Sequence, residues 1–483
     1  MENILIQVDN IDARIESALV PSVTTLIYEE LKYHPDGYEH VYSFKSKRWD
    51  GYNRLFKPST LSFRRGLLPR VQRILEDNGY KVLINNKMRE TGSVEHKFNS
   101  DLIRPFAFQQ GVIPVVEQND VGIIVSPTGS GKTVMIGMMI NAVHKYTMVM
   151  VTDVVLLDQM QQSLQRLFDQ PIGIIGDGEF DLQSITVTTL QSFASITSAK
   201  TIGAADKRKI LLQYLNMVGM VISDEAHLYD SESVEAIMPY FTHTTKFYGM
   251  SATPYGWAEK AEKRSNLELE QHFGNVIYDC RKNNFIELGL KAPLLVNIIN
   301  RIPVKQDWNV HWKADRFGKK TLDHTKNYKE CLNGELLDNE AYHDEVAAFA
   351  NDLASGGRSV FVHAPHRLSF SKSIQERIEG SVLINGSTPR LKRRAIYDAM
   401  RKKEILALVS DVGGTGLDIP SLDALILAGD MKDIRQLKGR VERASPGKSS
   451  GLLIDLNTDT QFLGKHHAIR RSQYKSDSNI ILG

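Results

Sequence analysis

The stretch Val121–Ile140, VGIIVSPTGSGKTVMIGMMI, constrains the fold of this chain more than any other. Residues 122–125 have the pattern of a buried parallel strand, and an apolar run with helical character follows the loop PTGSGKT at 127–133. A strand, a glycine-rich turn and a helix in this order form a phosphate-binding loop, because glycine lets backbone N–H groups approach a phosphate closely. The helix N-terminus adds its dipole to the same anion site. The stretch therefore predicts binding of a nucleoside triphosphate.

Individual residues of this loop have distinct chemical roles. Lys132 can reach the β- and γ-phosphates of a nucleotide, and the hydroxyl of Thr133 can hold Mg²⁺. The expected nucleotide contacts are Thr128, Gly129, Ser130, Gly131, Lys132 and Thr133. The alternative is an ordinary strand-to-helix turn that happens to contain glycine, lysine and threonine.

Composition indicates an ordinary globular protein. The 483 residues are too many for one core, so we expect two or three domains. The apolar content of 42% and charged content of 24% are not those of a disordered chain, and the net charge of +2 by itself implies no polyanion partner. Cys280 and Cys331 are too few for a disulfide framework and fit a reducing compartment. The N-terminus lacks a signal-peptide pattern and no apolar run reaches about 18 residues, so we expect a soluble, cytoplasmic protein.

Apolar runs divide the chain into three expected domains. Residues 1–98 alternate short apolar runs with polar turns around a helical pattern near Leu67–Gly79, which predicts a small α+β domain. Residues 99–298 alternate apolar and helical segments, and the expected strands are 121–125, 147–151, 185–188, 219–223 and 247–250.

The third expected domain, residues 299–483, begins with a polar connection up to about residue 340, which we interpret as a hairpin or an excursion. The alternation then resumes, with expected strands at 359–363, 381–384, 405–409, 424–428 and 451–455. A basic, helix-like segment lies in the tail after Asp459. Strand–helix alternation predicts an α/β fold of parallel sheets covered on both faces, with ligands at the carboxyl ends of the strands.

Basic and aromatic residues are interleaved between Lys45 and Arg73. Nine basic residues there are opposed by one acid, Asp50. Lysine and arginine neutralise phosphates and aromatic rings stack on bases, so the mixture predicts a surface that binds nucleic acid. The expected contacts are Lys47, Arg48, Trp49, Arg64 and Arg65. Alternatively, the aromatic residues form the core of the first domain and the charges are its solvated face.

An acidic motif follows the apolar run that ends at Ser223. A phosphate-binding loop needs a carboxylate at a neighbouring strand end to hold Mg²⁺, and Asp224 is placed for this role. Glu225 can deprotonate the attacking water, and His227 can sense the γ-phosphate. The alternative is a solvated acidic turn. Ser251-Ala252-Thr253, after the strand expected at 247–250, could link this loop to a neighbouring segment.

A second set of candidate residues lies near the C-terminus. The segment RQLKGRVER at 435–443 places Arg440 and Arg443 three residues apart, on one face if the segment is helical. Such arginines can stabilise charge developing on a γ-phosphate. The glycine-rich loop at 410–420 offers Gly416 for a backbone contact to a phosphate and Asp418 for a ribose or for Arg443. The alternatives are a basic surface helix and an ordinary glycine turn.

Taken together, these motifs occur in the order found in superfamily 2 helicases, which the chain resembles over about residues 100–445. Further matches are RPFAFQ at 104–109, VTTLQS at 187–192, VFVH at 360–363 and LINGST at 383–388. The resemblance implies two tandem RecA-like domains, a DEAH box at 224–227, and ATP and Mg²⁺ as cofactors. It also implies that Gln109 reads adenine, that Gln436 is catalytic with Arg440 and Arg443, and that Thr189, Gln191 and His363 contact nucleic acid. One departure is Thr152-Asp153, where the family usually has Pro-Thr for a contact to the DNA backbone.

The first domain narrows the resemblance. Trp49-Asp50-Gly51, Arg54-Leu55-Phe56, Gly66-Leu67-Leu68 and Asn78-Gly79-Tyr80 resemble the N-terminal domain of UvsW-like phage helicases. This implies an enzyme, a monomer or loose oligomer in the host cytoplasm, that acts on branched DNA through fork regression, Holliday-junction branch migration and R-loop unwinding.

Three other functions stay open at this point. The core motifs do not separate RNA from DNA helicases. A duplex translocase that does not separate strands would carry the same motifs. A non-catalytic DNA-binding scaffold could have kept the fold, although Lys132, Asp224 and Glu225 argue against it.

Overall fold

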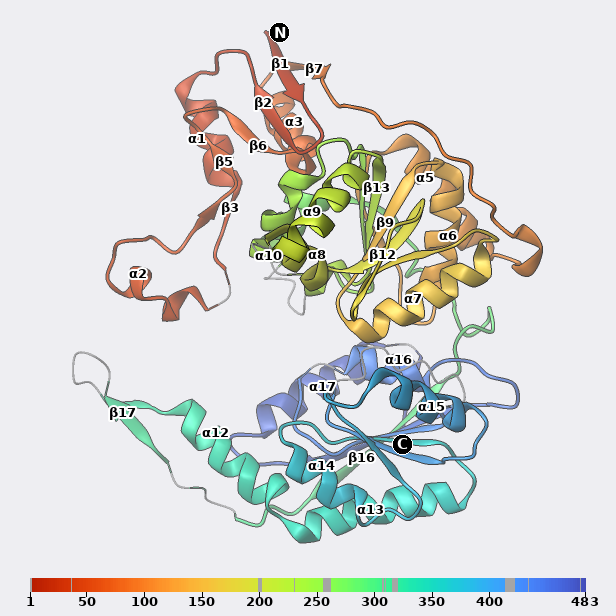
Figure 1. The fold of residues 1–483 in the computed structure, drawn as a ribbon. Coiled ribbons are helices and arrows are strands. Elements are labelled where there is room, and N and C mark those ends of the chain that lie inside the picture. Colours follow the sequence, from red (N-terminus) through yellow and green to blue (C-terminus); the bar gives the residue numbers. More distant parts are fainter. Residues whose placement is uncertain are drawn as a thin grey trace. The chain divides into compact units, whose positions relative to one another are not determined.

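The computed structural model describes residues 2–35, 37–198, 202–229, 231–254, 262–305, 308, 310–314, 320–412, 422–432, 434–477 and 479–483. It divides into two compact units, one of residues 1–127 and 131–283 and the other of residues 284–483 with 128–130. Each unit is described by itself (Figure 1). The predicted boundary between residues 298 and 299 is therefore wrong, because it falls inside a strand, Leu294–Arg301, that pairs along its whole length in the second unit.

The first unit begins with a five-stranded sheet in the order β5-β6-β2-β1-β7. Its strands are β1 Asn3–Val8, β2 Asp12–Ile15, β5 Phe56–Lys57, β6 Ser62–Arg64 and β7 Lys81–Asn86. Helices α1 (Pro21–Glu30) and α3 (Leu68–Asp77) complete this N-terminal module, which agrees with the predicted α+β domain. Val71 and Leu75, four residues apart on α3, are buried with Ile4 and Ile6 of β1 because positions i and i+4 share one face of a helix.

A separate excursion leaves the module between α1 and β5, as the red ribbon in Figure 1 shows. It comprises β3 Lys32–Tyr33, α2 Tyr42–Lys45 and β4 Asn53–Arg54, and β3 pairs antiparallel with β4. The excursion contains three of the five nucleic-acid contacts expected in this module, Lys47, Arg48 and Trp49.

The module is fixed to the rest of the first unit by arginines. Arg65 is 5% exposed and donates to the carbonyl oxygen of Thr245 at 2.8 Å. Arg64 binds Glu235, and Arg70 donates to Glu270 at 2.7 Å. Burial lowers the pKa of Arg65 to about 10. These charges hold two parts of one unit together.

An eight-stranded sheet forms the centre of the first unit, in the order β11-β10-β12-β9-β13-β14-β8-β15. Its strands are β8 Val121–Val125, β9 Tyr146–Val151, β10 Gly173–Gly176, β11 Glu179–Asp181, β12 Ile185–Thr189, β13 Val218–Ser223, β14 Lys246–Ser251 and β15 Val276–Asp279. All neighbours are parallel except β10 and β11. The five strands predicted between residues 121 and 250 are confirmed to within one residue or two.

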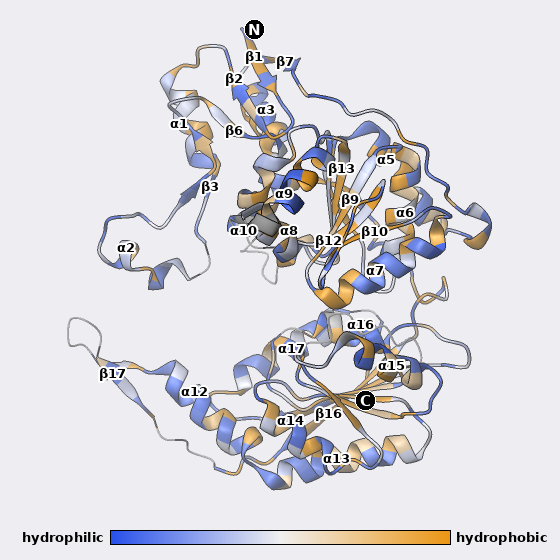
Figure 2. Ribbon diagram, in the orientation of Figure 1, coloured by the Kyte–Doolittle hydropathy of each residue, from blue (hydrophilic) through white to orange (hydrophobic). Residues whose placement is uncertain are grey.

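Helices cover both faces of this sheet. They are α4 Ala107–Gln110, α5 Val112–Gln118, α6 Lys132–Val143, α7 Val154–Leu167, α8 Leu190–Ser198, α9 Ile202–Leu215, α10 Ser231–Ile237 and α11 Glu262–Phe273. Figure 1 shows α5, α6 and α7 on one side of the strands and α8, α9 and α10 on the other. Hydrophobic residues gather on the strands and hydrophilic ones on loops and outer helical turns (Figure 2), as expected of a parallel sheet that is buried on both faces.

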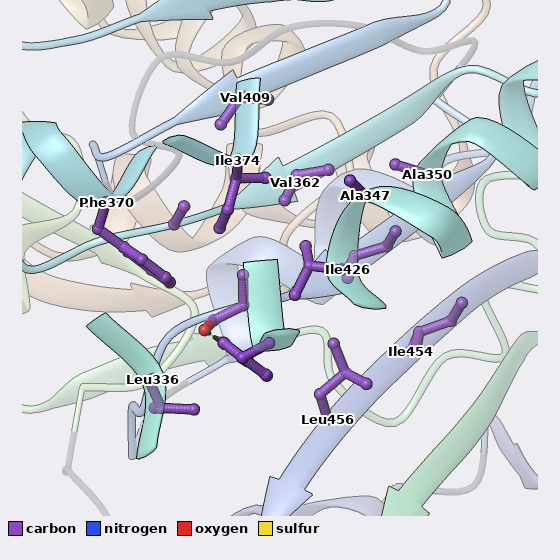
Figure 3. Close-up of a cluster of buried hydrophobic side chains, with 14 of the residues drawn as sticks. Leu336, Ala347, Ala350, Val362, Phe370, Ile374, Val409, Ile426, Ile454 and Leu456 are labelled. Carbon is purple, nitrogen blue, oxygen red and sulfur yellow. Dashed lines mark hydrogen bonds between the residues drawn. The ribbon is translucent and has the colours of Figure 1, made fainter. Parts of the chain in front are cut away.

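The second unit contains a seven-stranded, wholly parallel sheet in the order β20-β21-β19-β22-β23-β16-β24. Its strands are β16 Leu294–Arg301, β19 Val360–His363, β20 Val382–Ile384, β21 Ala407–Ser410, β22 Ala424–Leu427, β23 Gly451–Thr458 and β24 Ile480–Leu482. Its helices are α12 His324–Leu332, α13 Glu340–Ser355, α14 Leu368–Gln375, α15 Arg390–Arg401, α16 Arg435–Val441 and α17 Gly464–Ser476. On one face, Val362, Ile426 and Ile454 pack against Phe370 and Ala350 of the covering helices (Figure 3).

The polar connection contains a short antiparallel ribbon, β17 (Trp312–Ala314) with β18 (Lys320–Leu322), followed by α12. The basic tail segment is α17, which packs on the second sheet. Its Arg470 is 3% exposed and donates to Asp455 at 2.9 Å. In the described part of the chain, every helix falls short of the length and apolarity that a membrane span needs.

Gly66 tests how tightly the N-terminal module is fitted to α11. A Cβ at this position would lie 2.1 Å from the backbone oxygen of Glu270, so Gly66→Ala should force the two backbones apart. We expect a loss of about 1–3 kcal/mol in the free energy of unfolding, measured by chemical denaturation. Gly92→Ala, where a Cβ meets nothing within 4 Å, is the control and should be neutral. Equal stabilities of the two variants would contradict this tight fit.

Candidate active site

The order of the parallel strands brings three loops to one edge of the first sheet. β14 lies between β13 and β8, and Ser251 at its end is opposite Val125 at the end of β8. Backbone hydrogen bonds continue past the strands, from Ser126 N to Ser251 O at 2.9 Å and from Asp224 N to Met150 O at 2.9 Å. The glycine-rich loop, the acidic motif and the Ser-Ala-Thr segment therefore start side by side.

The glycine-rich loop has the backbone that a phosphate-binding loop requires. Gly129 and Gly131 have φ angles of 82° and 81°, in the left-handed region that favours glycine, and α6 begins at Lys132. Gln109 lies directly on this loop, because a Cβ on Gly131 would be 2.4 Å from its Nε2 atom. The side-chain oxygen of Gln109 accepts a hydrogen bond from Phe106 N at 2.9 Å, which fixes the carboxamide orientation. The loop and the glutamine thus form one assembly.

Lys132 meets both acids of the motif after β13. Its ammonium group forms an ion pair with Glu225 and lies 3.8 Å from Asp224 Oδ1. The three side chains are only 10–15% exposed, so these charges interact with little screening by water. Glu225 adopts a left-handed φ of 50°, and its backbone N–H donates to Asp224 Oδ1 at 3.0 Å. This sharp turn lets two consecutive carboxylates approach the same lysine.

His227 connects the acidic motif to the end of β14. Its Nδ1 atom is 2.8 Å from Ser251 Oγ and 3.6 Å from Glu225 Oε2. Ser251 Oγ also accepts a hydrogen bond from Thr253 N at 3.0 Å. The imidazole ring of His227 therefore links Glu225 to the loop after β14, so that a movement of Glu225 would also change the contact with Ser251.

Two residues in this region have roles that the sequence did not reveal. Tyr229 is 8% exposed, and burial, followed by the charges of Asp224, Glu225 and Asp153, raises the pKa of its hydroxyl well above the ordinary value. Asp153 caps α7 by accepting from Val155 N and Leu156 N at 2.9 and 3.0 Å. The acid that replaces the family's usual Pro-Thr therefore has a local structural reason. In the sequence, only the short separation of five residues between Asp224 and Tyr229 could have indicated that Tyr229 lies near the acids.

Several residues predicted to contact nucleic acid are buried or are bonded to other residues of the protein. Arg64 and Arg65 fix the N-terminal module, and Arg65 is too buried to meet a phosphate. Thr189 is 2% exposed and its hydroxyl bonds Ser192, whereas Gln191 is exposed. His363 is 3% exposed, and burial lowers its pKa to about 4. For Arg65, Thr189 and His363 the prediction is wrong, because a buried side chain cannot bind an external strand.

The excursion of the N-terminal module keeps its basic residues outside. Lys47 and Arg48 are exposed, and Trp49 is half-buried with its indole N–H donating to Tyr52 O at 2.8 Å. They line one shallow groove together with Tyr28, Phe44, Lys45, Asp50 and Arg54. The structure thus brings Lys47, Arg48 and Trp49 together and separates them from Arg64 and Arg65.

In the second unit, the predicted arginine pair does not share one helix. Arg440 lies on α16, which also contains Gln436, but Arg443 follows the end of that helix at Val441. The cause is Glu442, which is 1% exposed and accepts from Lys291 at 2.8 Å, while Ala292 N donates to its backbone oxygen at 2.6 Å. This pairing turns the chain out of the helix. Gly416 and Asp418 lie outside the described residues.

The sequence is similar to proteins whose names describe nucleic-acid motors. Residues 86–256 match the family described as "Type III restriction enzyme, res subunit". Over 77% of its length the chain is 25% identical to the "Putative DNA 3'-5' helicase Rad25" of Haloarcula marismortui, of which it covers 55%. Over 28% of its length it is 32% identical to the "DNA 3'-5' translocase XPB2" of Sulfurisphaera tokodaii, of which it covers 27%. The chain spans 55–63% of the curated relatives that it matches along most of its own length.

Solved structures show the same fold. A variant of S. cerevisiae Dbp5 bound to RNA and ADP BeF3 matches with a TM-score of 0.54 and 13% identity, over 79% of this chain and 91% of that one. T4 UvsW aligns over 100% of this chain and 99% of its own, with a TM-score of 0.45 and 18% identity. The predicted fold class, tandem parallel-sheet units of the RecA-like kind, is confirmed. In sequence, the chain is similar to proteins named as DNA helicases and as a DNA translocase.

Gly131 tests whether the loop and Gln109 act as one assembly. Gly131→Ala adds both the strain of a left-handed φ and a clash with Gln109, so the affinity for ATP should fall by at least about tenfold, which corresponds to about 1.4 kcal/mol. Gly178→Ala is the matched control, because it has a φ of 85° and a Cβ there meets nothing within 4 Å. Titration with a fluorescent ATP analogue measures both. Equal affinities would show that the contact with Gln109 does not matter for binding.

Proposed function

We propose that this protein is an ATP-driven motor that acts on DNA. The observation that carries the proposal is the assembly of Lys132, Asp224 and Glu225 beside a left-handed glycine loop, at the carboxyl edge of a parallel sheet. A cation for phosphates, a carboxylate for a metal and a second carboxylate for water are the groups that phosphoryl transfer requires.

The roles within the site follow from the chemistry of each group. Lys132 and the N-terminal backbone N–H groups of α6 bind the phosphates. The hydroxyl of Thr133 and the carboxylate of Asp224 fit Mg²⁺, because both offer the hard oxygen ligands that it prefers, and the ion neutralises phosphate charge when bound. Glu225 accepts a proton from the attacking water. Since Lys132 contacts Glu225, a phosphate that attracts the ammonium group also changes the basicity of this carboxylate.

The proposal also assigns roles to His227 and to two arginines of the second unit. His227 transmits the state of Glu225 to Ser251 and Thr253 through the contacts at 2.8 and 3.0 Å. Arg440 and Arg443 meet the charge that develops on the γ-phosphate during turnover, a role supported by their place in a motif resembling that of superfamily 2 helicases.

DNA is favoured as the substrate by the curated relatives, whose names describe a DNA helicase and a DNA translocase. We further propose branched DNA as the preferred form, and a UvsW-like role in fork regression, junction migration or R-loop unwinding. The support is the resemblance of the first domain and the exposed groove that contains Lys47, Arg48 and Trp49. An RNA helicase and a duplex translocase without strand separation are the alternatives.

The role of Glu225 is testable by a nearly isosteric change. Glu225→Gln keeps the size of the side chain but removes the base, so ATP hydrolysis should fall about 10²- to 10⁴-fold while ATP affinity changes little. Glu117→Gln, an exposed acid on α5, is the control and should hydrolyse ATP normally. Steady-state hydrolysis and analogue binding are measured together. Unchanged turnover of Glu225→Gln would exclude Glu225 as the base.

The nucleic-acid substrate is tested by the stimulation of ATP hydrolysis. The rate is measured alone and with single-stranded DNA, duplex DNA, a four-way junction or RNA at one salt concentration, because phosphate-driven affinity falls steeply with ionic strength. We expect the strongest stimulation with the junction. Stimulation mainly by RNA, or by plain duplex without strand separation on forks, would support the respective alternative, and absence of hydrolysis would indicate a non-catalytic scaffold.

A further inference from the structure

An exposed tryptophan stands on the ribbon of the second unit. Trp312 on β17 is 60% exposed, whereas Trp308, four residues earlier, is 8% exposed in the core. The register pairs Trp312 with Leu322 and Ala314 with Lys320, so these four residues share one face of the ribbon. Figure 1 shows the ribbon and α12 extending away from the sheet of the second unit. A large indole left in water on a projecting element is not explained by packing.

The root of this ribbon is held by two buried polar side chains. Glu335, which is 0% exposed, accepts hydrogen bonds from Val304 N at 2.9 Å and from the indole N–H of Trp308 at 2.9 Å. Asn327, which is 1% exposed, accepts from His311 N at 2.6 Å and donates to His311 O at 3.2 Å. Burying a carboxylate and an amide costs free energy unless their bonds are made. The ribbon therefore leaves the domain in a fixed direction.

The charge around Trp312 is predominantly positive. Among the described residues of 310–330, four lysines oppose two acids, Asp323 and Glu330, and Glu330 pairs with His311. Lys320 is exposed on the same face as Trp312, whereas Lys313 lies on the opposite face and forms an ion pair with Asp323 at 3.9 Å. A lysine beside an exposed aromatic ring, in a positively charged segment, matches the chemistry of single-stranded nucleic acid, in which phosphates alternate with bases that present flat faces.

We propose that the β17–β18 ribbon is a contact for single-stranded nucleic acid, in which Trp312 stacks on an unpaired base and Lys320, on the same face of the ribbon, meets a flanking phosphate. This inference rests on the proposed function and adds to it a second binding element, on a different unit from the groove of Lys47 and Arg48. Stacking is tolerant of sequence because every base has a π-face, so the contact recognises unpaired strands of any sequence. Paired bases are shielded by their neighbours, so duplex DNA should use this contact less.

Three variants test the stacking. Trp312→Ala should weaken binding of a labelled oligo(dT) by roughly 5- to 100-fold, while Trp312→Phe, which keeps a ring, should bind within a few-fold of the unchanged protein. Ile302→Ala is the matched control, because Ile302 is 88% exposed on the same connection but lies outside the ribbon. Fluorescence anisotropy of the full chain without nucleotide, at fixed salt, measures all three.

The outcomes separate this inference from the proposed function. Binding without nucleotide does not depend on hydrolysis, so a chain that fails to hydrolyse ATP can still show the effect of Trp312→Ala. Hydrolysis by Trp312→Ala without nucleic acid should equal that of the unchanged protein. Unchanged oligo(dT) binding by Trp312→Ala would overturn the proposal. An equal loss in Ile302→Ala would overturn it too, because the effect would then belong to apolar surface in general.

Discussion

The pairing of β14 with β13 on one side and β8 on the other is the constraint on which the active site depends. Parallel strands end at the same edge, so this order places the loops after residues 125, 223 and 251 beside one another. The pairing extends past the strands through Ser126 and Asp224, which leaves little freedom in where the next residues begin. Lys132, Glu225 and Ser251 then converge although more than a hundred residues separate the first from the last.

Elsewhere in the chain, buried ion pairs fix the course of the backbone. Such pairs stabilise the fold only while every charge keeps its partner. Burial alone would lower the pKa of Lys438, yet the carboxylates of Glu442 and Asp477 raise it above the ordinary value. Lys291 binds the same Glu442. Removing one partner of such a group leaves a buried charge uncompensated and costs about 3–5 kcal/mol. The cluster therefore fixes the course of the backbone after α16, and with it the position of the backbone at Arg443.

Local patterns were predictable from the sequence, and properties set by distant residues were not. The strand, loop and helix around Lys132 follow from neighbours in the chain, as do the alternating strands of both units. Arg65 and Lys47 look alike in a basic stripe, but only the fold buries one and exposes the other, because Thr245 accepts from Arg65 across 180 residues. Likewise, Arg440 and Arg443 have helical spacing, but Lys291, far away in sequence, binds Glu442, the residue directly after the helix.

The same distinction separates structural from binding roles among the aromatic residues. Trp308 has a hydrogen-bonded indole in a core, so its volume and its polar N–H serve the fold. Trp312 begins the ribbon directly after His311, which Asn327 anchors at the root, yet its own side chain is 60% exposed. Ordering a protruding ribbon costs conformational entropy that its few contacts barely offset. A partner that stacks on the ring would recover part of this cost, which is the physical reason to look for a ligand there.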